Sequence, residues 1–532
     1  MSLIARLRAL LQRGGEPKTV ISVHRERQVA VFSILLVLLL GLPLWWTTTR
    51  VYRAELPAAE ISQFSPQTTF AVPVKFYISA ETLLSPAEIA SIEQSVQSRV
   101  DAQRKPHAAG EWRVRYRVSV HSGSAPDAPG HYTLRLRTGG KASAIDVGPG
   151  RSATVSVTQP SIKPALVEAI SAMVADEELR ASAVGKTGKH AALKYAPEYA
   201  VTLTLLNENP VDGAVVDWDI EQAVSEFLQP FVDELRPLAR LSVTTQVLHH
   251  AGPPPVSMIQ KNNATYLTHD MLPHFVNSPS WNFASIDPVS PMLNFVLFVP
   301  ALASQPVYIL GDQASDAEKS AFLVSQWGGV SIANLPKTTR PGDKVVLSLH
   351  ELQQHFGYFI SQLRSLVGIR SQIFQATTLS TIRVQPATST GVSGWELDAL
   401  MRRWLIYNRQ TAISTLQSLI RLVNSLENMV VMDEIKLKVD KALAALYEID
   451  QALSLPHDYL SAFSSAAKAA SFAESAFFDP SMVSMLYFPD QHKYAIYMPF
   501  FLPITMPLVA AVKKILAERR RRKQTDNESK QD

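Results

Sequence analysis

The sequence predicts a mixed α/β (α+β) body, followed by a helical C-terminal segment and held between two transmembrane helices. Two uncharged stretches near the chain ends are long enough to span a bilayer. Between them, strands with alternating apolar residues are interspersed with amphipathic helices over residues 47–390. Residues 391–493 carry only helical patterns and lead to the second apolar stretch.

The C-terminal apolar stretch, residues 494–512, has 19 residues without a charge. A helix of that length spans ~28 Å, close to the thickness of the hydrocarbon core of a bilayer. Basic residues begin at Lys513 and continue through Arg519–Lys523. Because cationic residues gather at the cytosolic ends of membrane helices, residues 513–532 are predicted to form a basic cytosolic tail.

The N-terminal apolar stretch, residues 29–46, has 18 uncharged residues. It is longer than the apolar region of a signal peptide, and no small-residue cleavage site follows it. Arg25 and Arg27 precede it. Residues 1–28 are therefore predicted to be a cytosolic tail, and the body between the two helices lies across the membrane.

The charge distribution argues against a nucleic-acid partner. The chain has a formal net charge of +4, but residues 1–28 carry six Lys or Arg against two acidic residues. Residues 513–532 carry eight against four, so the remainder of the chain has a net charge of −4. The basic excess belongs to the tails, where it orients the anchors and can contact anionic membrane lipid. The sequence contains no cysteine, which excludes disulfides and a cysteine nucleophile in this chain.

The elements of the body follow from local patterns. Strands are predicted near residues 70–79, 112–121, 131–137, 144–147, 154–157, 199–206, 241–248, 294–299 and 307–310. Helices are predicted at 85–104, 163–178, 219–236, 348–367, from 393 with an apolar stripe that is interrupted around Asn408, at 433–453, and from 457 to 477. Residues 249–291 are proline-rich and predict a long loop-rich region, and residues 327–329 predict a tight turn.

Titratable residues in the body have structural explanations as well as chemical ones. Asp217 and Asp219 flank Trp218 and could perform acid/base chemistry, but a carboxylate just before a helix more often caps it. His249 and His250 are adjacent, and neighbouring strand residues point to opposite faces, so they cannot chelate one ion from regular structure.

A third group, His350, Glu351 and His355, lies on one predicted helix, but Glu351 is needed for its capping box. No metalloprotease, nucleophile-elbow or nucleotide-binding motif is present. The sequence therefore predicts no catalytic residue, no metal site and no cofactor.

Two further features concern modification and assembly. Asn263 begins an N-glycosylation triplet in the body, whereas Asn527 begins one in the predicted cytosolic tail, where it would remain unmodified. Pro499, Pro503 and Pro507 recur every four residues in the second apolar stretch and share one helix face. This face either forms a tolerated kink or packs on partner helices or lipid.

Several long stretches resemble one family. They are YAPEYAVTLTLLNENP (195–210), WDIEQAVSEFLQPFVDELRPLARLSVTTQVLHH (218–250), PMLNFVLFVP (291–300), FLVSQWGGVSIANLP (322–336) and RLVNSLENMVVMD (421–433), together with both terminal anchors. These stretches are similar to the S subunit of glycosylphosphatidylinositol (GPI) transamidase, the PIG-S family. They are core and turn segments and carry no catalytic motif.

This resemblance implies a non-catalytic subunit of a complex in the endoplasmic-reticulum membrane. That complex replaces a hydrophobic C-terminal signal of a secretory protein with the GPI lipid, and a separate caspase-like subunit supplies its Cys/His pair. The resemblance thus implies a luminal body, with the other transamidase subunits as partners. Two rivals are a membrane-tethered luminal hydrolase or glycosyltransferase using carboxylates such as Asp217 and Asp219, and a luminal chaperone outside any fixed complex.

Overall fold

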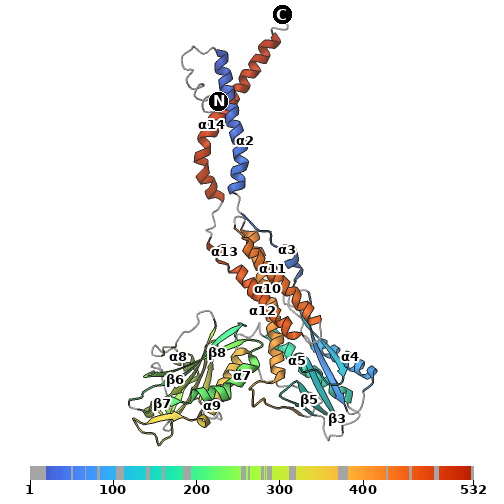
Figure 1. Cartoon of the computed structure of the whole chain (residues 1–532), viewed down its shortest axis with the longest axis vertical. Helices are drawn as coiled ribbons and strands as arrows, with labels where there is room; N and C mark the ends of the chain where they lie inside the picture. Colours follow the sequence, from blue (N-terminus) through green and yellow to red (C-terminus); the bar gives the residue numbers. More distant parts are fainter. Residues whose placement is uncertain are drawn as a thin grey trace, which may run out of the picture. The chain divides into compact units, whose positions relative to one another are not determined.

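A computed structural model describes most of the chain (Figure 1). The described residues are 20–49, 52–65, 68–80, 84–103, 113–138, 144–157, 162–183, 193–211, 213–252, 259–261, 264–276, 281, 283, 290–310, 319–369, 381–426, 429–454, 458–484 and 490–528. The chain divides into two compact units. One combines Met1–Pro57, Ser418–Val439 and Ser475–Asp532, and the other combines Ala58–Gln417 with Asp440–Glu474.

The larger unit contains two mixed sheets, the first with the strand order β16-β4-β5-β3-β1-β2. Its strands are β1 (Phe70–Ala80), β2 (Val114–Ser122), β3 (His131–Thr138), β4 (Ala144–Val147), β5 (Ser152–Val157) and β16 (Thr381–Val384). β1 pairs in parallel with both β2 and β3, so the loop between β2 and β3 crosses the end of β1 instead of forming a hairpin. Helix α4 (Pro86–Gln103) packs against β2 and against α5 (Ile162–Ala183).

Pro73 lies inside β1, although proline cannot donate to a ladder. Pairing of β1 with β3 begins only at Lys75, which lies opposite His131. The Lys75 N–H donates to the Gly130 carbonyl at 3.0 Å. Alternate residues of a strand direct their backbone groups to the same side, so the missing donor of Pro73 lies on the β3 side, before the ladder starts. The central position of β1 is therefore compatible with a proline.

The second sheet has the strand order β13-β14-β11-β6-β8. Its strands are β6 (Glu198–Asn207), β8 (Arg240–His249), β11 (Met292–Val299), β13 (Ala321–Val324) and β14 (Gly328–Ile332). β6 and β11 are almost entirely buried, as expected for the continuous apolar runs of central parallel strands. Helix α9 (Leu349–Val367) packs on β14, and a helical run of α6 (Ile220–Ala223), the π-helical η1 (Val224–Leu228) and α7 (Gln229–Leu235) packs beside α9 and β8.

The turn that joins β13 to β14 covers residues 325–327, and Gly328 and Gly329 begin β14. Gly328 has φ of +148°, and a Cβ there would lie 1.8 Å from the Asn294 carbonyl oxygen of β11. A Cβ on Gly329 would lie 2.0 Å from the Gln362 side chain of α9. The two glycines therefore let the backbone of β14 approach its neighbours, and the turn predicted at 327–329 begins two residues earlier.

Smaller elements complete the larger unit. β9 (Ile259–Lys261), β10 (Ala264–Leu267) and β12 (Val307–Ile309) form a three-stranded sheet, β7 (Val215–Trp218) pairs with β15 (Lys344–Leu347), and short helices are α3 (Ala58–Gln63), η2 (His269–Met271), α8 (Leu272–Phe275) and η3 (Leu302–Ser304). Phe275 of α8 packs edge-on against Trp281 and Phe298, so this region joins the core of the second sheet. The loop-rich region predicted over 249–291 thus also contains β9, β10 and α8, which were not predicted.

The C-terminal region is helical, as predicted. It contains α10 (Gly394–Ser425), α11 (Asp433–Ser454), α12 (Tyr459–Phe477) and α13 (Pro480–Ser484). The long helix predicted from Ser393 is α10, which continues through Asn408, the residue at which its apolar stripe is interrupted, and Asn408 is buried.

In the smaller unit, α2 (Val20–Thr49) contacts α14 (Asp490–Glu528) (Figure 1). The segment after α2 forms hydrogen bonds with the segment between α10 and α11 and with the start of α11. The Ala54 N–H donates to the Val431 carbonyl, and Tyr52 Oη donates to Asp433. Among the residues that the structure describes, none of the helices combines the length and apolar character needed to cross a membrane.

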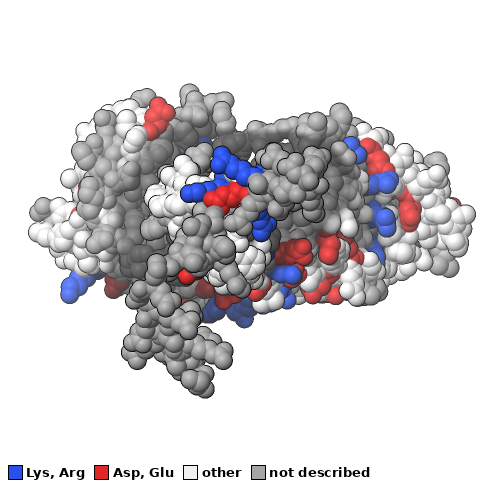
Figure 2. Space-filling view, turned by 90° about the horizontal axis from the view of Figure 1, so that it is seen from above, with Lys and Arg blue, Asp and Glu red and all other residues white. Residues whose placement is uncertain are grey.

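Basic and acidic side chains are interspersed among uncharged residues on the face in Figure 2. On the described part of that face, Lys and Arg do not gather into one continuous patch.

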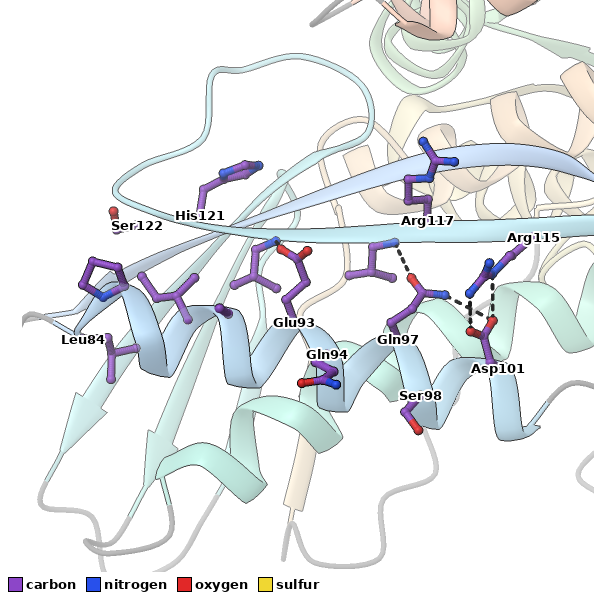
Figure 3. A pocket seen from close by; sticks show the side chains of 15 residues that line it. Leu84, Glu93, Gln94, Gln97, Ser98, Asp101, Arg115, Arg117, His121 and Ser122 are labelled. Carbon is purple, nitrogen blue, oxygen red and sulfur yellow. Dashed lines mark hydrogen bonds and ion pairs between the residues drawn. The ribbon is translucent and has the colours of Figure 1, made fainter.

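The outer edge of β2 is covered by side chains of α4 (Figure 3). Gln97 Nε2 donates to the Tyr116 carbonyl at 3.1 Å, and Gln97 Oε1 accepts from the Val118 N–H at 3.0 Å. Glu93 accepts from the Val120 N–H at 2.9 Å. These side-chain groups bond the edge strand in place of a neighbouring strand, which protects the edge from pairing with another chain.

Replacing Gln97 by leucine should destabilise the protein by about 1–2 kcal/mol, because it leaves one backbone donor and one acceptor of β2 unsatisfied. The free energy of unfolding, measured in urea, tests this. Gln94→Leu is the matched control, since Gln94 is exposed on the same helix. Equal stability of the two variants would contradict the protective role of Gln97.

Candidate functional site

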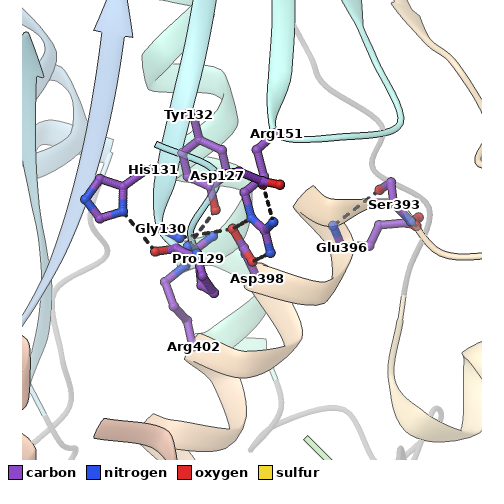
Figure 4. Close-up of polar contacts among 10 residues, drawn as sticks. All are labelled: Asp127, Pro129, Gly130, His131, Tyr132, Arg151, Ser393, Glu396, Asp398 and Arg402. Carbon is purple, nitrogen blue, oxygen red and sulfur yellow. Dashed lines mark hydrogen bonds and ion pairs between the residues drawn. The ribbon is translucent and has the colours of Figure 1, made fainter. Parts of the chain in front are cut away.

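The N-terminal turns of α10 gather several charged side chains that bond to residues far away in the sequence (Figure 4). The Ser393 N–H donates to Glu396 at 2.9 Å, and the Glu396 N–H donates to Ser393 Oγ at 3.3 Å. This reciprocal capping box satisfies two backbone donors and fixes where α10 begins. The helix start predicted from Ser393 and Glu396 is thereby confirmed.

Asp398, one turn into α10, is the acceptor at the centre of this cluster. Its two carboxylate oxygens accept from Arg151 Nε and Nη2, each at 2.9 Å. The Gly130 N–H donates to the same carboxylate at 3.0 Å. Asp398 is 1 % exposed and Arg151 is 19 % exposed. Burial lowers the pKa of Arg151, but its hydrogen bonds to Asp398 outweigh burial and raise that pKa above its usual value.

Aromatic contacts extend the cluster into the first sheet. Trp395 stacks on Tyr132 of β3 with ring centroids 4.1 Å apart and planes 5° apart. Arg402, one turn after Asp398, donates to Tyr132 Oη at 2.7 Å. Arg402 is 3 % exposed and also lies over the Tyr132 ring, 5.6 Å from its centroid. The first two turns of α10 are therefore fixed to β3 by stacking as well as by charge.

The same turns of α10 also contact α9, the helix that packs on β14 of the second sheet. Arg364 of α9 pairs with Glu396 through two hydrogen bonds, at 2.5 and 3.1 Å. Arg403 donates to the carbonyl of Gly368, the left-handed residue that ends α9, at 2.8 Å. We call Arg151, Arg364, Glu396, Asp398 and Arg402 the α10 junction. Its donors are used within the protein, so it positions elements and is not arranged to bind and transform a substrate.

The predicted acid/base carboxylates lie elsewhere. Asp217 is an exposed residue of β7 and accepts from the Trp218 N–H at 2.8 Å. Asp219 is exposed and occupies the N-cap position of α6, but its side chain makes no capping hydrogen bond. The capping position predicted for Asp219 is therefore confirmed and its capping bond is not.

The histidines singled out by the sequence lie on two different elements, β8 and α9. His249 ends β8 and His250 follows it with φ of +58°, so the pair lies at a strand end as predicted. Glu351 forms the predicted capping box with Ser348, and His350 lies beside it. In the described part of the chain, His, Asp and Glu side chains do not form a cluster of three that could hold a metal ion.

His355 bonds to Ser331 of β14 through Nδ1, at 2.8 Å. Burial lowers the pKa of His355 to about 4, which keeps the ring neutral at pH 7. Ser331 is fully buried, so the pair packs α9 onto β14 and presents no accessible nucleophile.

The remaining predicted site residues are Asn263 and three prolines. Asn263 lies outside the described residues. Pro499, Pro503 and Pro507 lie within α14, and all three are exposed. Asp398, Arg151 and Arg402 were not singled out by the sequence. Asp398 and Arg402 lie on α10, where charged residues next to the predicted apolar stripe were a signal, whereas Arg151 precedes β5 and carried none.

The sequence was compared with protein families and with individual proteins. The family model for phosphatidylinositol-glycan biosynthesis class S protein matches residues 32–522. The chain belongs to the PIG-S family. The match covers nearly the whole chain and includes both sheets, the α10 junction and all the long helices of the C-terminal region.

Individual relatives of the family extend over the same length. The chain is 31% identical to the GPI-anchor transamidase component PIGS of Rattus norvegicus, across 95% of this chain and 97% of the relative. It is 30% identical to the protein of the same name from Homo sapiens, across 95% and 98%. The GPI transamidase component PIG-S homolog of Schizosaccharomyces pombe is 27% identical, across 93% and 85%.

Replacing Asp398 by asparagine should destabilise the protein by about 3 kcal/mol, because it leaves the Arg151 guanidinium largely buried without its counter-charge. The free energy of unfolding in urea measures this cost. Asp127 also pairs with Arg151 but is 92% exposed, so Asp127→Asn should cost less than about 1 kcal/mol. A loss for Asp398→Asn no larger than for Asp127→Asn would contradict the central role of Asp398.

Proposed function

We propose that this chain is a non-catalytic component of the GPI-anchor transamidase, the complex that attaches the GPI anchor to the C-terminus of secretory proteins in the endoplasmic reticulum. The observation that carries the proposal is the family match over residues 32–522, with relatives from yeast and mammals that are named as components of this enzyme. The hydrolase or glycosyltransferase alternative depends on Asp217 and Asp219, which are exposed on separate elements, β7 and the α6 N-cap.

The chemical step is proposed to belong to a caspase-like subunit that supplies a cysteine. This chain contains no cysteine and so cannot form a thioester with the substrate. Its contribution is instead to hold the other subunits in place. The α10 junction supports this role, because bonded charges fix one long helix to both sheets and give a rigid body on which partners can assemble.

If the chain acts in assembly, its candidate acids and bases should be dispensable. Asp217→Asn with Asp219→Asn, and separately His249→Ala with His250→Ala, should leave GPI attachment within about twofold of the parent. The measurement is surface display of a GPI-anchored reporter in cells that lack the endogenous subunit. Affinity capture of each variant should recover the same membrane proteins as the parent. A variant that assembles fully but has lost turnover would favour the enzyme alternative.

Membrane placement is the second part of the proposal. Two membrane-spanning segments at 29–46 and 494–512, with both termini cytosolic and the body luminal, rest on the sequence pattern of apolar stretches with basic outer flanks. The cytosolic tails are then residues 1–28 and 513–532, and Asn263 would be a luminal glycosylation site.

Protease added to sealed microsomes should remove both tails and leave the body intact. Asn263→Gln should run faster on a gel through loss of one glycan, whereas Asn527→Gln should run unchanged. Digestion of the body in sealed vesicles would contradict the topology. Unchanged mobility of Asn263→Gln would remove the glycan alone.

Pro499, Pro503 and Pro507 are proposed to contact other subunits or lipid on one face of α14. Each proline removes a backbone donor and frees a carbonyl that lipid cannot satisfy, so a neighbouring helix would offset the cost. The exposure of all three prolines in this chain leaves that face open to a partner. Kinked faces also let membrane helices approach closely.

Changing all three prolines to leucine should keep membrane insertion, since leucine favours the bilayer, but should reduce recovery of partner subunits severalfold. Quantitative capture from detergent extracts measures this. The control replaces Leu502, Ile504 and Val509, other exposed apolar residues of α14, by phenylalanine. Normal assembly and GPI attachment in the proline variant would show that the prolines form only a tolerated kink.

A further inference from the structure

The second sheet has an open edge at β8. This strand pairs with β6 on one side and is the last of the described strands in the sheet order. It is ten residues long, and residues 241–248 have the sequence LSVTTQVL, without a charge, a proline or a glycine. Edge strands are usually short, charged or interrupted by proline, because an uncovered edge pairs with other chains. The middle of β8 carries none of these protective features.

The outward backbone groups of β8 belong to its odd-numbered residues. The Arg240 N–H donates to the Pro197 carbonyl at 2.9 Å, on the β6 side. Backbone groups alternate along a strand, so the residues that direct N–H and C=O away from β6 are Leu241, Val243, Thr245 and Val247. Within the described part of the chain, neither a side chain nor another strand bonds to these groups. The edge of β2 differs, because Gln97 and Glu93 bond to it.

A groove of about 1060 Å³ lies beside this edge, between β8 and the helical run of α6, η1 and α7. We call it the β8 groove, and its apolar lining consists of Ile220, Val224, Val232, Leu241 and Val243. Exposure on this face of β8 rises from buried Leu241 through half-buried Val243 to exposed Thr245, which also lines the groove. A strand added outside β8 would direct every second side chain into this apolar groove.

Two arginines line the end of the groove at which α7 leads into β8. Arg236 is 69 % exposed and bonds to Asp233 at 2.6 Å. Arg240 is 78 % exposed and meets Glu198 at 3.9 Å, which is too far for a hydrogen bond. The donors of the Arg240 guanidinium are therefore available to a carboxylate on an occupant of the groove.

We propose that β8 is extended by a strand from a neighbouring protein subunit. Alternate side chains of that strand are apolar and lie in the β8 groove, and an acidic residue lies beside Arg240. The proposal rests on the proposed function to the extent that a multi-subunit complex supplies this neighbour.

The outward backbone groups determine the chemical class of the occupant. Donors and acceptors alternate along the edge with a repeat of about 7 Å, which another extended polypeptide reproduces. The acyl chain of a lipid would cover the apolar lining of the groove but would leave these backbone groups without partners. The groove beside the edge then adds specificity to the affinity that main-chain hydrogen bonds supply.

Photo-crosslinking in the assembled complex tests the identity of the occupant. With Thr245→p-benzoylphenylalanine in the full chain, ultraviolet light should yield a crosslink to another subunit. The control is Leu323→p-benzoylphenylalanine, because Leu323 is 41 % exposed on β13, outside the groove lining. It should yield at least fivefold less of that product. A crosslink only to lipid or to a second copy of this chain, or equal yields from both positions, would overturn the proposal.

A proline on the edge tests the backbone pairing. Introduced into the Thr245 crosslinking protein, Val243→Pro removes an outward N–H and leaves the ladder with β6 in place, so it should reduce the crosslink at least fivefold. The melting temperature of the purified chain should stay within a few degrees of the parent. Val346→Pro is the matched control, since Val346 lies on β15, is 64 % exposed and directs its N–H away from β7. It should leave the crosslink unchanged.

A substitution in the groove keeps the test decisive if Val243→Pro reduces folding. Gln229→Trp fills the groove from α7 and should also reduce the crosslink at least fivefold. Glu226→Trp is its control, because Glu226 is exposed on η1 but does not line the groove. Crosslinks equal to the parent in both Val243→Pro and Gln229→Trp would overturn the proposal.

A charge reversal tests the acidic residue of the partner strand. Arg240→Glu should reduce the crosslink about three- to tenfold through like-charge repulsion, whereas Arg340→Glu, an exposed position outside the groove lining, should leave it unchanged. Equal crosslinks from these two variants would overturn the placing of an acidic residue beside Arg240.

Failure of the proposed function looks different from failure of this proposal. If the proposed function fails, the parent chain captures none of the transamidase subunits. A complex that assembles normally without the Thr245 crosslink would reject the added strand alone.

Discussion

The architecture of the larger unit depends on the pairing of Asp398 with Arg151. Asp398 is almost completely buried, and it is neutralised by one guanidinium and the Gly130 N–H, both from the first sheet's loops. A buried carboxylate is tolerated only when it is paired and hydrogen-bonded, so the start of α10 has one place where it can dock on this sheet. Glu396, two residues earlier, meets Arg364 from the other sheet's helix layer. Glu396 and Asp398, two acidic residues in one turn of α10, therefore connect this helix to both sheets.

This arrangement is suited to a subunit whose role is assembly. Charged groups at the α10 junction are used internally, and the outer edge of β2 is closed by Gln97 and Glu93. The body thus limits uncontrolled pairing with other chains. The exposed proline face of α14 is then one surface that we propose for a partner.

Sequence patterns predicted the elements whose signals are local. The capping boxes at Ser348 and Ser393, the buried runs of β6 and β11 and the turn before Gly328 each depend on a few neighbouring residues. The pairing of Arg151 with Asp398 spans 247 residues and leaves no periodic signal. β9 and β10 were missed because prolines dominate their surroundings and their stability comes from pairing with distant β12. Asn408 interrupts the apolar stripe of α10 in the sequence, but its side chain is buried, so this helix buries a polar residue that periodicity alone does not place in the core.

A double-mutant cycle on Arg151 and Asp398 tests the central claim most directly. Arg151→Met and Asp398→Asn are measured singly and together, with the free energy of unfolding in urea as the readout. The account predicts that the double variant loses at least about 1.5 kcal/mol less than the sum of the single losses, because either single change leaves a buried polar group without its partner. Additive losses would contradict the claim that this pair fixes α10 to the first sheet.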